Sequence, residues 1–351
     1  MRFQRFLNQL QENRLDGFLI SRLSNLHYLF GFRGSAGLAL CLGGRAHLLV
    51  DSRYLQQARQ TAHDCTPCLA EGSYESALRG LMEKLQEDGA APRIGVEENH
   101  LTWAWVRQIE SWELNYQIAP AQDLVGVLRR CKEADEIALI REALRLAQTA
   151  LGQVRPRLRP GMSEIEMAGE LERALRRQGA EGYAFESIVA GGERSALPHA
   201  SASDRLWRAD ELLLVDFGLR RRGYHSDLTR VILPPGGEEE KRVAEIVRQA
   251  AGKAVAAIKP GVEARAVDQA ARQHIAEAGY GDYFGHGLGH GLGLDVHEAP
   301  RVSKTGTEVL AEGMVFTVEP GIYLPGRFGV RIEDVVAVTR DGFEYLSDPS
   351  L

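Results

Sequence analysis

The chain has 351 residues, 44% of them hydrophobic and 26% charged, a composition typical of a globular protein long enough for two domains. Its net charge of −6 gives no basic surface, so we expect no nucleic-acid partner. No apolar run reaches the length of a membrane span or a signal peptide, so we expect no membrane association. The 4 cysteines are too few for a disulfide framework, and we expect a cytoplasmic location.

The first third of the chain alternates predicted helices with predicted strands. Helices are expected over residues 1–15, from residue 53, over 78–86 and over 101–109. Strands are expected over residues 18–21, 38–42, 46–50 and 94–96. Gly43-Gly44 predicts a hairpin between the two middle strands, while the glycines within residues 25–37 are typical of turns. The alternation predicts an α/β domain over residues 1–122.

The rest of the chain, residues 123–351, contains an internal repeat. One or two long helices are expected over residues 124–151. Residues 159–179 and 259–279 then share one pattern, a helix that a Pro-Gly pair opens and a glycine closes, at an offset of 100 residues. An apolar strand that carries an acid follows each copy. Two copies predict a duplicated α+β unit in which two hairpins face each other.

Four acids on these hairpins can be placed by counting residues. If each turn is symmetric, Asp216 lies opposite Asp227 and Glu319 lies opposite Glu333. Directly opposed residues have Cβ atoms about 4.5–5.5 Å apart, so two acids there repel each other unless a cation lies between them. Four solvated hairpin charges are the alternative, but apolar residues precede Asp216 and Glu319, and an acid that ends a buried strand needs a partner. The acids with one imidazole can therefore hold two metal ions.

Residues 285–298 contain 3 histidines among 5 glycines. A neutral imidazole can ligate a metal and a charged one can carry a proton, while glycines allow close approach of a backbone or ligand. His297-Glu298 could begin a helical zinc-protease motif, but Arg301 stands where that motif needs its second histidine. A glycine-rich loop with surface histidines is the alternative. We interpret the segment as part of the same metal site.

Together these residues resemble the pita-bread metallopeptidases, the family of aminopeptidase P, prolidase and methionine aminopeptidase, over essentially the whole chain. The resemblance implies two divalent metal ions, with manganese expected first and zinc, cobalt or iron as alternatives. The implied metal ligands are Asp216, Asp227, His290, Glu319 and Glu333. It also implies an α+β fold: a duplicated pita-bread domain over residues 123–351, preceded by a smaller creatinase-like α/β domain.

The resemblance further assigns groups that contact the substrate. Glu319 is expected to act as general base. The expected active-site histidines are His199, His286 and His297. The expected substrate-binding residues are Tyr224, Arg301 and Arg331, with His27 and Arg33 from the N-terminal domain. For Arg301 and Arg331 a structural or surface role is the open alternative.

The N-terminal stretch 25–35 resembles the small domain of Xaa-Pro peptidases, which methionine aminopeptidases lack. The resemblance therefore implies hydrolysis of the Xaa-Pro bond of dipeptides, with an aminopeptidase P that acts on longer peptides as the alternative. His27, Arg33 or Arg301 could bind the dipeptide carboxylate and block longer substrates, and the sequence leaves this open. A non-enzymatic module of the same fold is a third interpretation, disfavoured by the complete ligand set. The resemblance also implies a homodimer.

Overall fold

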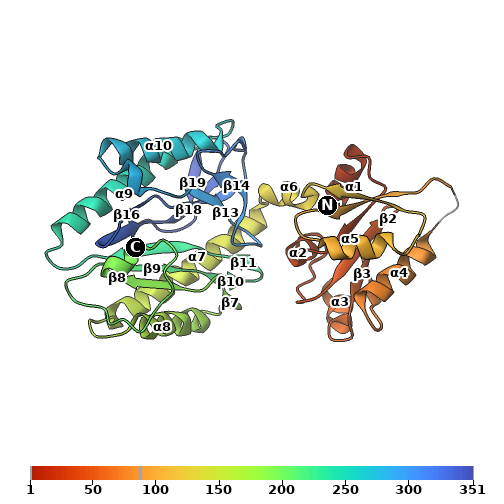
Figure 1. The fold of residues 1–351 in the computed structure, drawn as a ribbon, viewed down its shortest axis with the longest axis horizontal. Helices are drawn as coiled ribbons and strands as arrows, with labels where there is room; N and C mark the ends of the chain where they lie inside the picture. The colour runs from red at the N-terminus through yellow and green to blue at the C-terminus, as the bar shows by residue number, and fades with distance from the viewer. Residues whose placement is uncertain (1, 87–88, 351) are drawn as a thin grey trace. The chain divides into compact units, whose positions relative to one another are not determined.

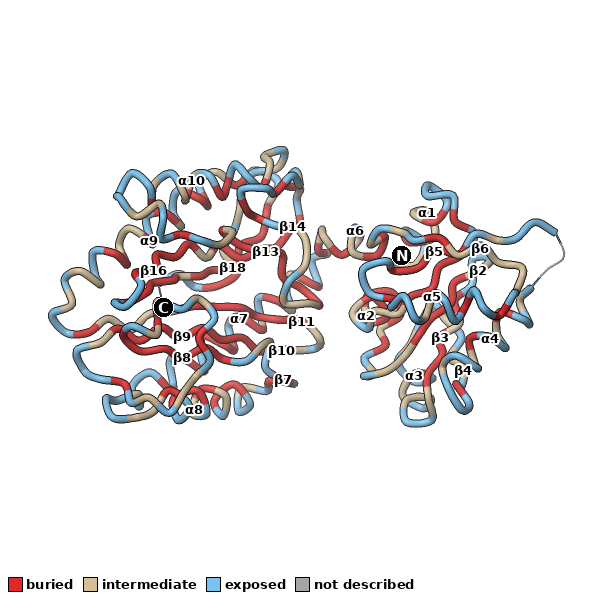
Figure 2. Tube along the Cα trace, viewed as in Figure 1, coloured by how far each residue is buried: buried red, intermediate tan, exposed pale blue. Residues whose placement is uncertain are grey.

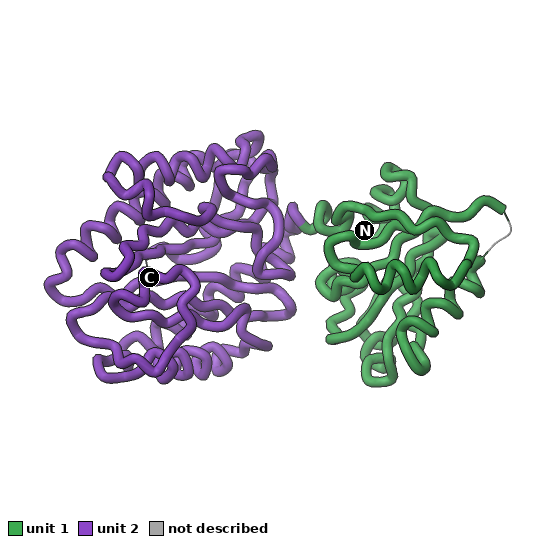
Figure 3. The backbone as a smooth tube through the Cα atoms, viewed as in Figure 1, with its two compact units in different colours: residues 1–129 green, residues 130–351 purple. Residues whose placement is uncertain are grey.

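The computed structural model describes residues 2–86 and 89–350, which form two compact units, residues 1–129 and 130–351 (Figures 1 and 3). The division falls at the end of helix α6 (Leu124–Arg130), whereas the sequence placed the boundary just before that helix. None of the described helices is long and apolar enough to cross a membrane. In Figure 2 the strands of both units are largely buried, and the helices alternate buried and exposed faces.

The N-terminal unit is built on a six-stranded mixed sheet with the order β4-β3-β2-β1-β5-β6. Its strands are β1 (Gly17–Ile20), β2 (Leu38–Leu42), β3 (Arg45–Val50), β4 (Thr66–Leu69), β5 (Arg93–Glu97) and β6 (Gln117–Ala121). Its other helices are α1 (Arg2–Glu12), α2 (Leu23–Phe30), α3 (Leu55–Thr61), α4 (Tyr74–Leu85) and α5 (Trp103–Glu110). The hairpin predicted at Gly43-Gly44 is confirmed, because these two glycines join β2 to β3.

One helix of this unit was not predicted. The glycines within residues 25–37 lie outside helices, as expected, but α2 covers the first part of that stretch. Its Leu26, Leu29 and Phe30 are fully buried, and this packing forms the helix despite the glycines that follow. Gly31 ends α2 with a φ of 70°, the left-handed conformation that glycine adopts without strain.

The C-terminal unit is duplicated, as the repeat predicted. Helices α8 (Glu164–Arg177) and α10 (Ala264–Glu277) have the same length, and their bounds differ by 100 residues. Helix α7 (Ala134–Val154) packs against α8, and α9 (Glu238–Ala256) packs against α10. In Figure 1 the strands lie between these two helix pairs. Short 3-10 helices follow at η1 (Arg155–Arg157), η2 (Gly192–Ala196) and η3 (Gly281–Tyr283).

The strands of this unit form four small sheets among the described residues. The orders are β11-β10-β7, β12-β9-β8, β14-β13-β15-β18-β19 and β16-β17. The first half contributes β7 (Gly182–Tyr183), β8 (Ile188–Gly191), β9 (Leu213–Phe217), β10 (Leu219–Arg221), β11 (Tyr224–His225) and β12 (Leu228–Ile232). The second half contributes β13 (Gly289–Gly291), β14 (Glu298–Val302), β15 (Val315–Val318), β16 (Gly321–Leu324), β17 (Phe328–Arg331), β18 (Asp334–Val338) and β19 (Phe343–Tyr345).

The register expected for the first hairpin was wrong by two residues, because Asp216 lies opposite Thr229 and not opposite Asp227. The turn is the pair Arg222-Gly223, with φ values of 50° and 84°, which is one residue later than the symmetric centre assumed. Asp227 lies two residues before Thr229, and since side chains alternate along a strand, Asp216 and Asp227 both reach the same pocket.

The second hairpin follows the expected register. Gly321 pairs with Arg331 across a turn centred on Gly326, and Val318 pairs with Asp334 farther from the turn. Glu319 and Glu333 lie between these two pairings, so they face each other as the count predicted.

Candidate metal centre

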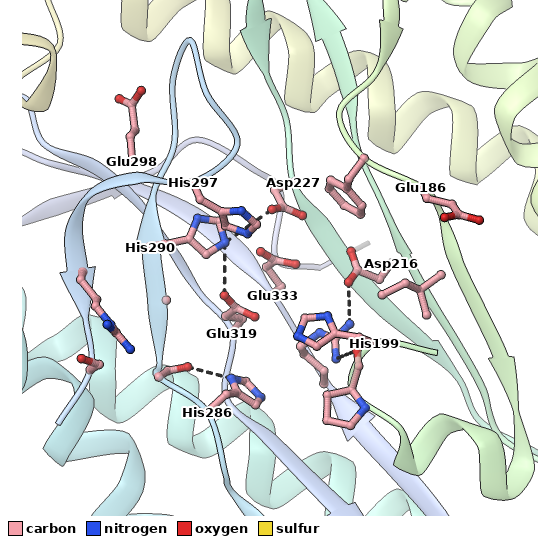
Figure 4. A pocket seen from close by; sticks show the side chains of 18 of the residues that line it. Glu186, His199, Asp216, Asp227, His286, His290, His297, Glu298, Glu319 and Glu333 are labelled. Atoms are coloured by element: carbon pink, nitrogen blue, oxygen red, sulfur yellow. Dashed lines mark hydrogen bonds and ion pairs between the residues drawn. The ribbon is translucent and has the colours of Figure 1, made fainter. Parts of the chain in front are cut away.

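The C-terminal unit contains a cavity of about 790 Å³, shown from close by in Figure 4. Each of the five expected metal ligands lines it: Asp216, Asp227, His290, Glu319 and Glu333. The lining also includes the three expected histidines and two of the expected arginines, namely His199, His286, His297, Arg301 and Arg331. The duplicated fold thus brings both acid-bearing hairpins and the histidine-rich segment to one place.

The five expected ligands come from strands of both halves. Asp216 belongs to β9, and Asp227 lies between β11 and β12. From the second half, His290 belongs to β13, while Glu319 and Glu333 lie at the ends of β15 and β18. Ligand atoms of Asp227, His290 and Glu333 all lie within 4.8 Å of one another. Nε2 of His290 is 3.6 Å from a carboxylate oxygen of Asp227 and 3.4 Å from one of Glu319.

Without a cation these carboxylates repel each other in a dry environment. Burial raises the pKa of Asp227 well above its ordinary value, and the charges of Glu333, Asp216 and Glu319 raise it further. Burial likewise raises the pKa of Glu319 to about 8. Burial, together with the nearby His297, lowers the pKa of His290 to about 4, so this imidazole is neutral near pH 7 and can ligate a metal.

The donor set fits divalent metal ions. Oδ1 of Asp216 is buried and has no hydrogen-bond partner among the described residues. A buried acceptor of this kind needs a partner, and a cation supplies one while it also cancels the repulsion between the acids. Oxygen ligands with one imidazole suit manganese, iron, cobalt or zinc.

Arg331 joins two of the ligands. Its Nη2 donates to Oδ2 of Asp216 at 2.5 Å, and its Nε donates at 3.0 Å to Thr229, whose hydroxyl donates in turn to Glu333 at 2.8 Å. Its Nη1 donates to the hydroxyl of Tyr323 and to the carbonyl of Pro198. Arginine has five N–H donors, and four of them are used here, which supports the structural role left open for Arg331; its expected contact with substrate stays a prediction.

Replacing Arg331 with lysine is therefore expected to lower kcat/KM by about 10- to 100-fold, because one ammonium cannot hold Asp216, Thr229 and Tyr323 together. Steady-state kinetics and the metal content of the purified protein measure the effect. Arg327→Lys is the matched control, since the exposed Arg327 lies in the turn of the same hairpin and pairs with Glu239. An Arg331→Lys protein with the activity of the control would contradict this role.

The three histidines have different environments. Nδ1 of His286 lies 2.7 Å from the carbonyl oxygen of Gly287, and its Nε2 lies 2.9 Å from the hydroxyl of Tyr323. A carbonyl only accepts, so Nδ1 carries the proton and Nε2 accepts from Tyr323. Burial lowers the pKa of His286 to about 4, which keeps the ring neutral. His286 therefore holds Tyr323, whereas His199 and His297 are exposed in the pocket lining.

Three other expected substrate-binding residues lie elsewhere. Tyr224 is buried outside the pocket lining, and its hydroxyl donates to Glu136 of α7 at 2.8 Å, so its expected contact with substrate is not supported. A tyrosine in an apolar core needs such a partner for its hydroxyl. His27 and Arg33 belong to the N-terminal unit, and their part in the site stays a prediction.

The hydroxyl groups that hydrogen-bond the expected ligands or their neighbours Arg331 and His286 were not identified from the sequence. Besides Thr229 and Tyr323, Thr317 donates to Glu319 at 3.2 Å and accepts from the backbone N–H of His290. Thr229 and Thr317 each lie two residues from a ligand, Asp227 and Glu319. Alternation along a strand puts residues two apart on one face, so this spacing could have revealed both threonines.

Comparison with protein families gives two matches. Residues 138–340 match the metallopeptidase family M24, and residues 2–131 match the creatinase/prolidase N-terminal domain. Among curated proteins, the Xaa-Pro dipeptidase of Pyrococcus horikoshii is 35% identical to the chain, with 98% of this chain and 96% of the relative covered.

Solved structures agree with the observed fold. The Xaa-Pro dipeptidase from Bacillus anthracis is 36% identical, with a TM-score of 0.93 and coverage of 99% of this chain and 97% of that one. The X-Pro aminopeptidase from Thermotoga maritima is also 36% identical, with a TM-score of 0.89 and the same coverage. These two proteins are named for different activities, so overall similarity alone does not separate the two activities.

Proposed function

Because the chain belongs to metallopeptidase family M24, we propose that it hydrolyses the Xaa-Pro bond of dipeptides. The relatives in Pyrococcus horikoshii and Bacillus anthracis, named as Xaa-Pro dipeptidases, support this substrate class. The observation that carries the choice of dipeptides is the position of Arg301. Its guanidinium is exposed in the pocket lining and has no hydrogen bond or ion pair among the described residues.

Arg301 lies beside the metal ligands. It pairs directly with His290 across β13 and β14, so the two side chains share one face of the sheet. Two extended residues span about 7 Å, a length that fits between the ligand cluster and a guanidinium one strand away. The free amine of a dipeptide would bind the acidic cluster, and its carboxylate would bind Arg301. A third residue would have to displace that contact.

The residues support hydrolysis by an activated water. When bound, divalent ions polarise a carbonyl and make water acidic enough to attack it near neutral pH. Glu319 would accept the proton of the attacking water and pass it to the leaving nitrogen of proline. His297, exposed in the lining, would donate a hydrogen bond to the oxyanion, and His199 would contact the substrate from the other half of the fold.

Replacing Arg301 with methionine is expected to raise KM for an Xaa-Pro dipeptide by about 10- to 100-fold, the loss of one hydrogen-bonded charge pair. For the same dipeptide with its carboxylate converted to an amide, the Arg301→Met substitution is expected to change KM little. Arg301→Lys keeps the positive charge without the planar guanidinium. Its KM for the dipeptide should lie between those of the wild type and Arg301→Met. Equal changes of KM on the acid and on the amide would contradict the carboxylate contact.

Aminopeptidase P activity on longer peptides is the second candidate, favoured by the Thermotoga maritima structure. We also propose manganese as the working metal and two ions per chain, since hard oxygen ligands predominate. A homodimer and a cytoplasmic location complete the proposal as predictions from family resemblance. Metal analysis of the purified protein tests the identity and number of the metal ions. The mass of the protein in solution tests the homodimer.

A further inference from the structure

Glu298 follows His297 in the chain and lines the pocket, yet the proposed chemistry gives it no task. Its carboxylate is held by a buried lysine. Nζ of Lys132 lies 2.8 Å from Oε1 of Glu298, and the two side chains are only 1% and 11% exposed. A lysine without water around it needs such a partner, because burial of an isolated ammonium is very unfavourable. Glu298 is therefore committed to Lys132 and is not free to act as a base.

Lys132 is itself fixed to the strand that leads to Glu319. Its backbone N–H donates to the carbonyl of Gly313 at 2.8 Å, and Nζ also donates to the carbonyl of Arg130. The preceding residue, Cys131, forms a β-bridge with Met314, directly before β15. These contacts fix the backbone of Lys132 beside the start of β15.

The segment that carries His297 closes around the carboxylate of Glu298. The backbone N–H of Asp295 points to Oε2 at 3.4 Å, and the backbone N–H of Gly293 donates to the carbonyl of Asp295. A Cβ on Gly293 would lie 2.6 Å from Oε1, so a larger residue here would push the carboxylate of Glu298 out of its present position. The backbone N–H of His225 donates to the carbonyl of Gly293 and closes the other side of the segment.

From these contacts we propose that Lys132 is a positioning residue, which fixes His297 in the pocket through the carboxylate of Glu298. The ring of His297 lies 4.2 Å, centroid to centroid, from the ring of the ligand His290, in an edge-on arrangement. A shift of about 1 Å at a reacting group can lower a rate about 100-fold, so a loose segment would show in kcat. The inference rests on the proposed function, in which His297 contacts the oxyanion.

The test is a double-mutant cycle on the full chain loaded with manganese. Lys132→Met is expected to lower kcat on an Xaa-Pro dipeptide by about 10- to 100-fold with little change in KM. In a His297→Ala background the same substitution is expected to change kcat by less than about twofold, since the group it positions is gone. Lys241→Met is the matched control: Lys241 pairs with Glu238 at the same 2.8 Å, but on the exposed surface of α9.

Hydrogen exchange gives a readout that needs no substrate. Backbone amides of residues 293–298 should exchange faster in Lys132→Met than in the wild type or in Lys241→Met. If Lys132→Met does not fold, Glu298→Gln, which removes the charge but keeps an acceptor oxygen, takes its place in the cycle. The positioning role would be overturned by an equal loss of kcat in the wild-type and His297→Ala backgrounds. Unchanged hydrogen exchange of residues 293–298 would overturn it as well. Turnover by the wild type decides the proposed function separately.

Discussion

Replacing Asp227 with asparagine is expected to remove activity while it stabilises the metal-free protein. Asp227 lies within 4.8 Å of the expected ligands His290 and Glu333. Loss of its charge should lower metal content and reduce kcat/KM by more than about 100-fold, the upper range for loss of a supporting group. Without metal, however, burial and the charges of Glu333, Asp216 and Glu319 disfavour ionised Asp227. The neutral amide relieves that repulsion, so the free energy of unfolding should rise by about 0.5–2 kcal/mol at pH 8.

Three measurements on one preparation check this pair of effects: bound metal, kcat/KM, and urea unfolding of the chelator-treated protein. Asp210→Asn is the control, because the side chain of Asp210 is 69% exposed and pairs with its surface neighbour Arg208. It is expected to change none of the three. A metal-free Asp227→Asn protein less stable than the wild type would show that the carboxylates do not repel each other as described.

The second large effect is expected for Glu319→Gln. As the proposed general base, Glu319 should contribute about 10²- to 10⁴-fold to turnover. Glutamine keeps the shape and one oxygen, so part of the metal is expected to stay bound, and kcat should fall more steeply than metal content. A Glu319→Gln protein that turns over at the wild-type rate with metal bound would exclude Glu319 as the base.

The same variant tests the electrostatics of the metal-free site. Burial raises the pKa of Glu319 from 4.5 to about 8, so the folded state holds this proton more tightly than the unfolded state does. The stability that results is present at low pH and is lost as the pH rises toward 8. His286 and His290, with pKa values lowered to about 4, act in the opposite sense, but only below about pH 6.5.

The informative window is therefore pH 6.5 to 8. Over this range the melting temperature of the metal-free wild type is expected to fall, and that of Glu319→Gln should fall less. Added manganese should reverse the trend, because a cation favours the ionised carboxylates, and its stabilising effect should be larger at pH 8 than at pH 6.5. A wild-type melting temperature that rises with pH in the absence of metal would contradict the raised pKa values.

Features of the fold and of the site that depend on residue type and spacing could be predicted from the sequence. Acids that end apolar strands, a dense set of histidines and an offset of 100 residues are all visible in one chain. They predicted that these acids and histidines meet in one pocket, and they predicted the duplicated helices α8 and α10. The second hairpin was also placed correctly, because Gly326 sits at the centre of a symmetric turn.

Features that depend on tertiary packing were not predictable in the same way. The first hairpin turns at Arg222, a residue that rarely adopts the left-handed φ of 50° found here, so the count placed the turn one residue early. The roles of Arg331 and Tyr224 follow from partners more than 80 positions away in the chain, Asp216 and Glu136. No local pattern signals such partners, so the sequence left the role of Arg331 open and assigned Tyr224 to the substrate.

Turnover of a matched substrate pair tests the central claim most directly. The manganese-loaded protein is assayed on an Xaa-Pro dipeptide and on the tripeptide that extends it by one residue. We predict cleavage of the dipeptide with a kcat/KM at least about 10-fold above that of the tripeptide, the ratio expected from one carboxylate contact with Arg301. Preferred cleavage of the tripeptide, or cleavage of neither peptide with metal bound, would contradict the assignment as an Xaa-Pro dipeptidase.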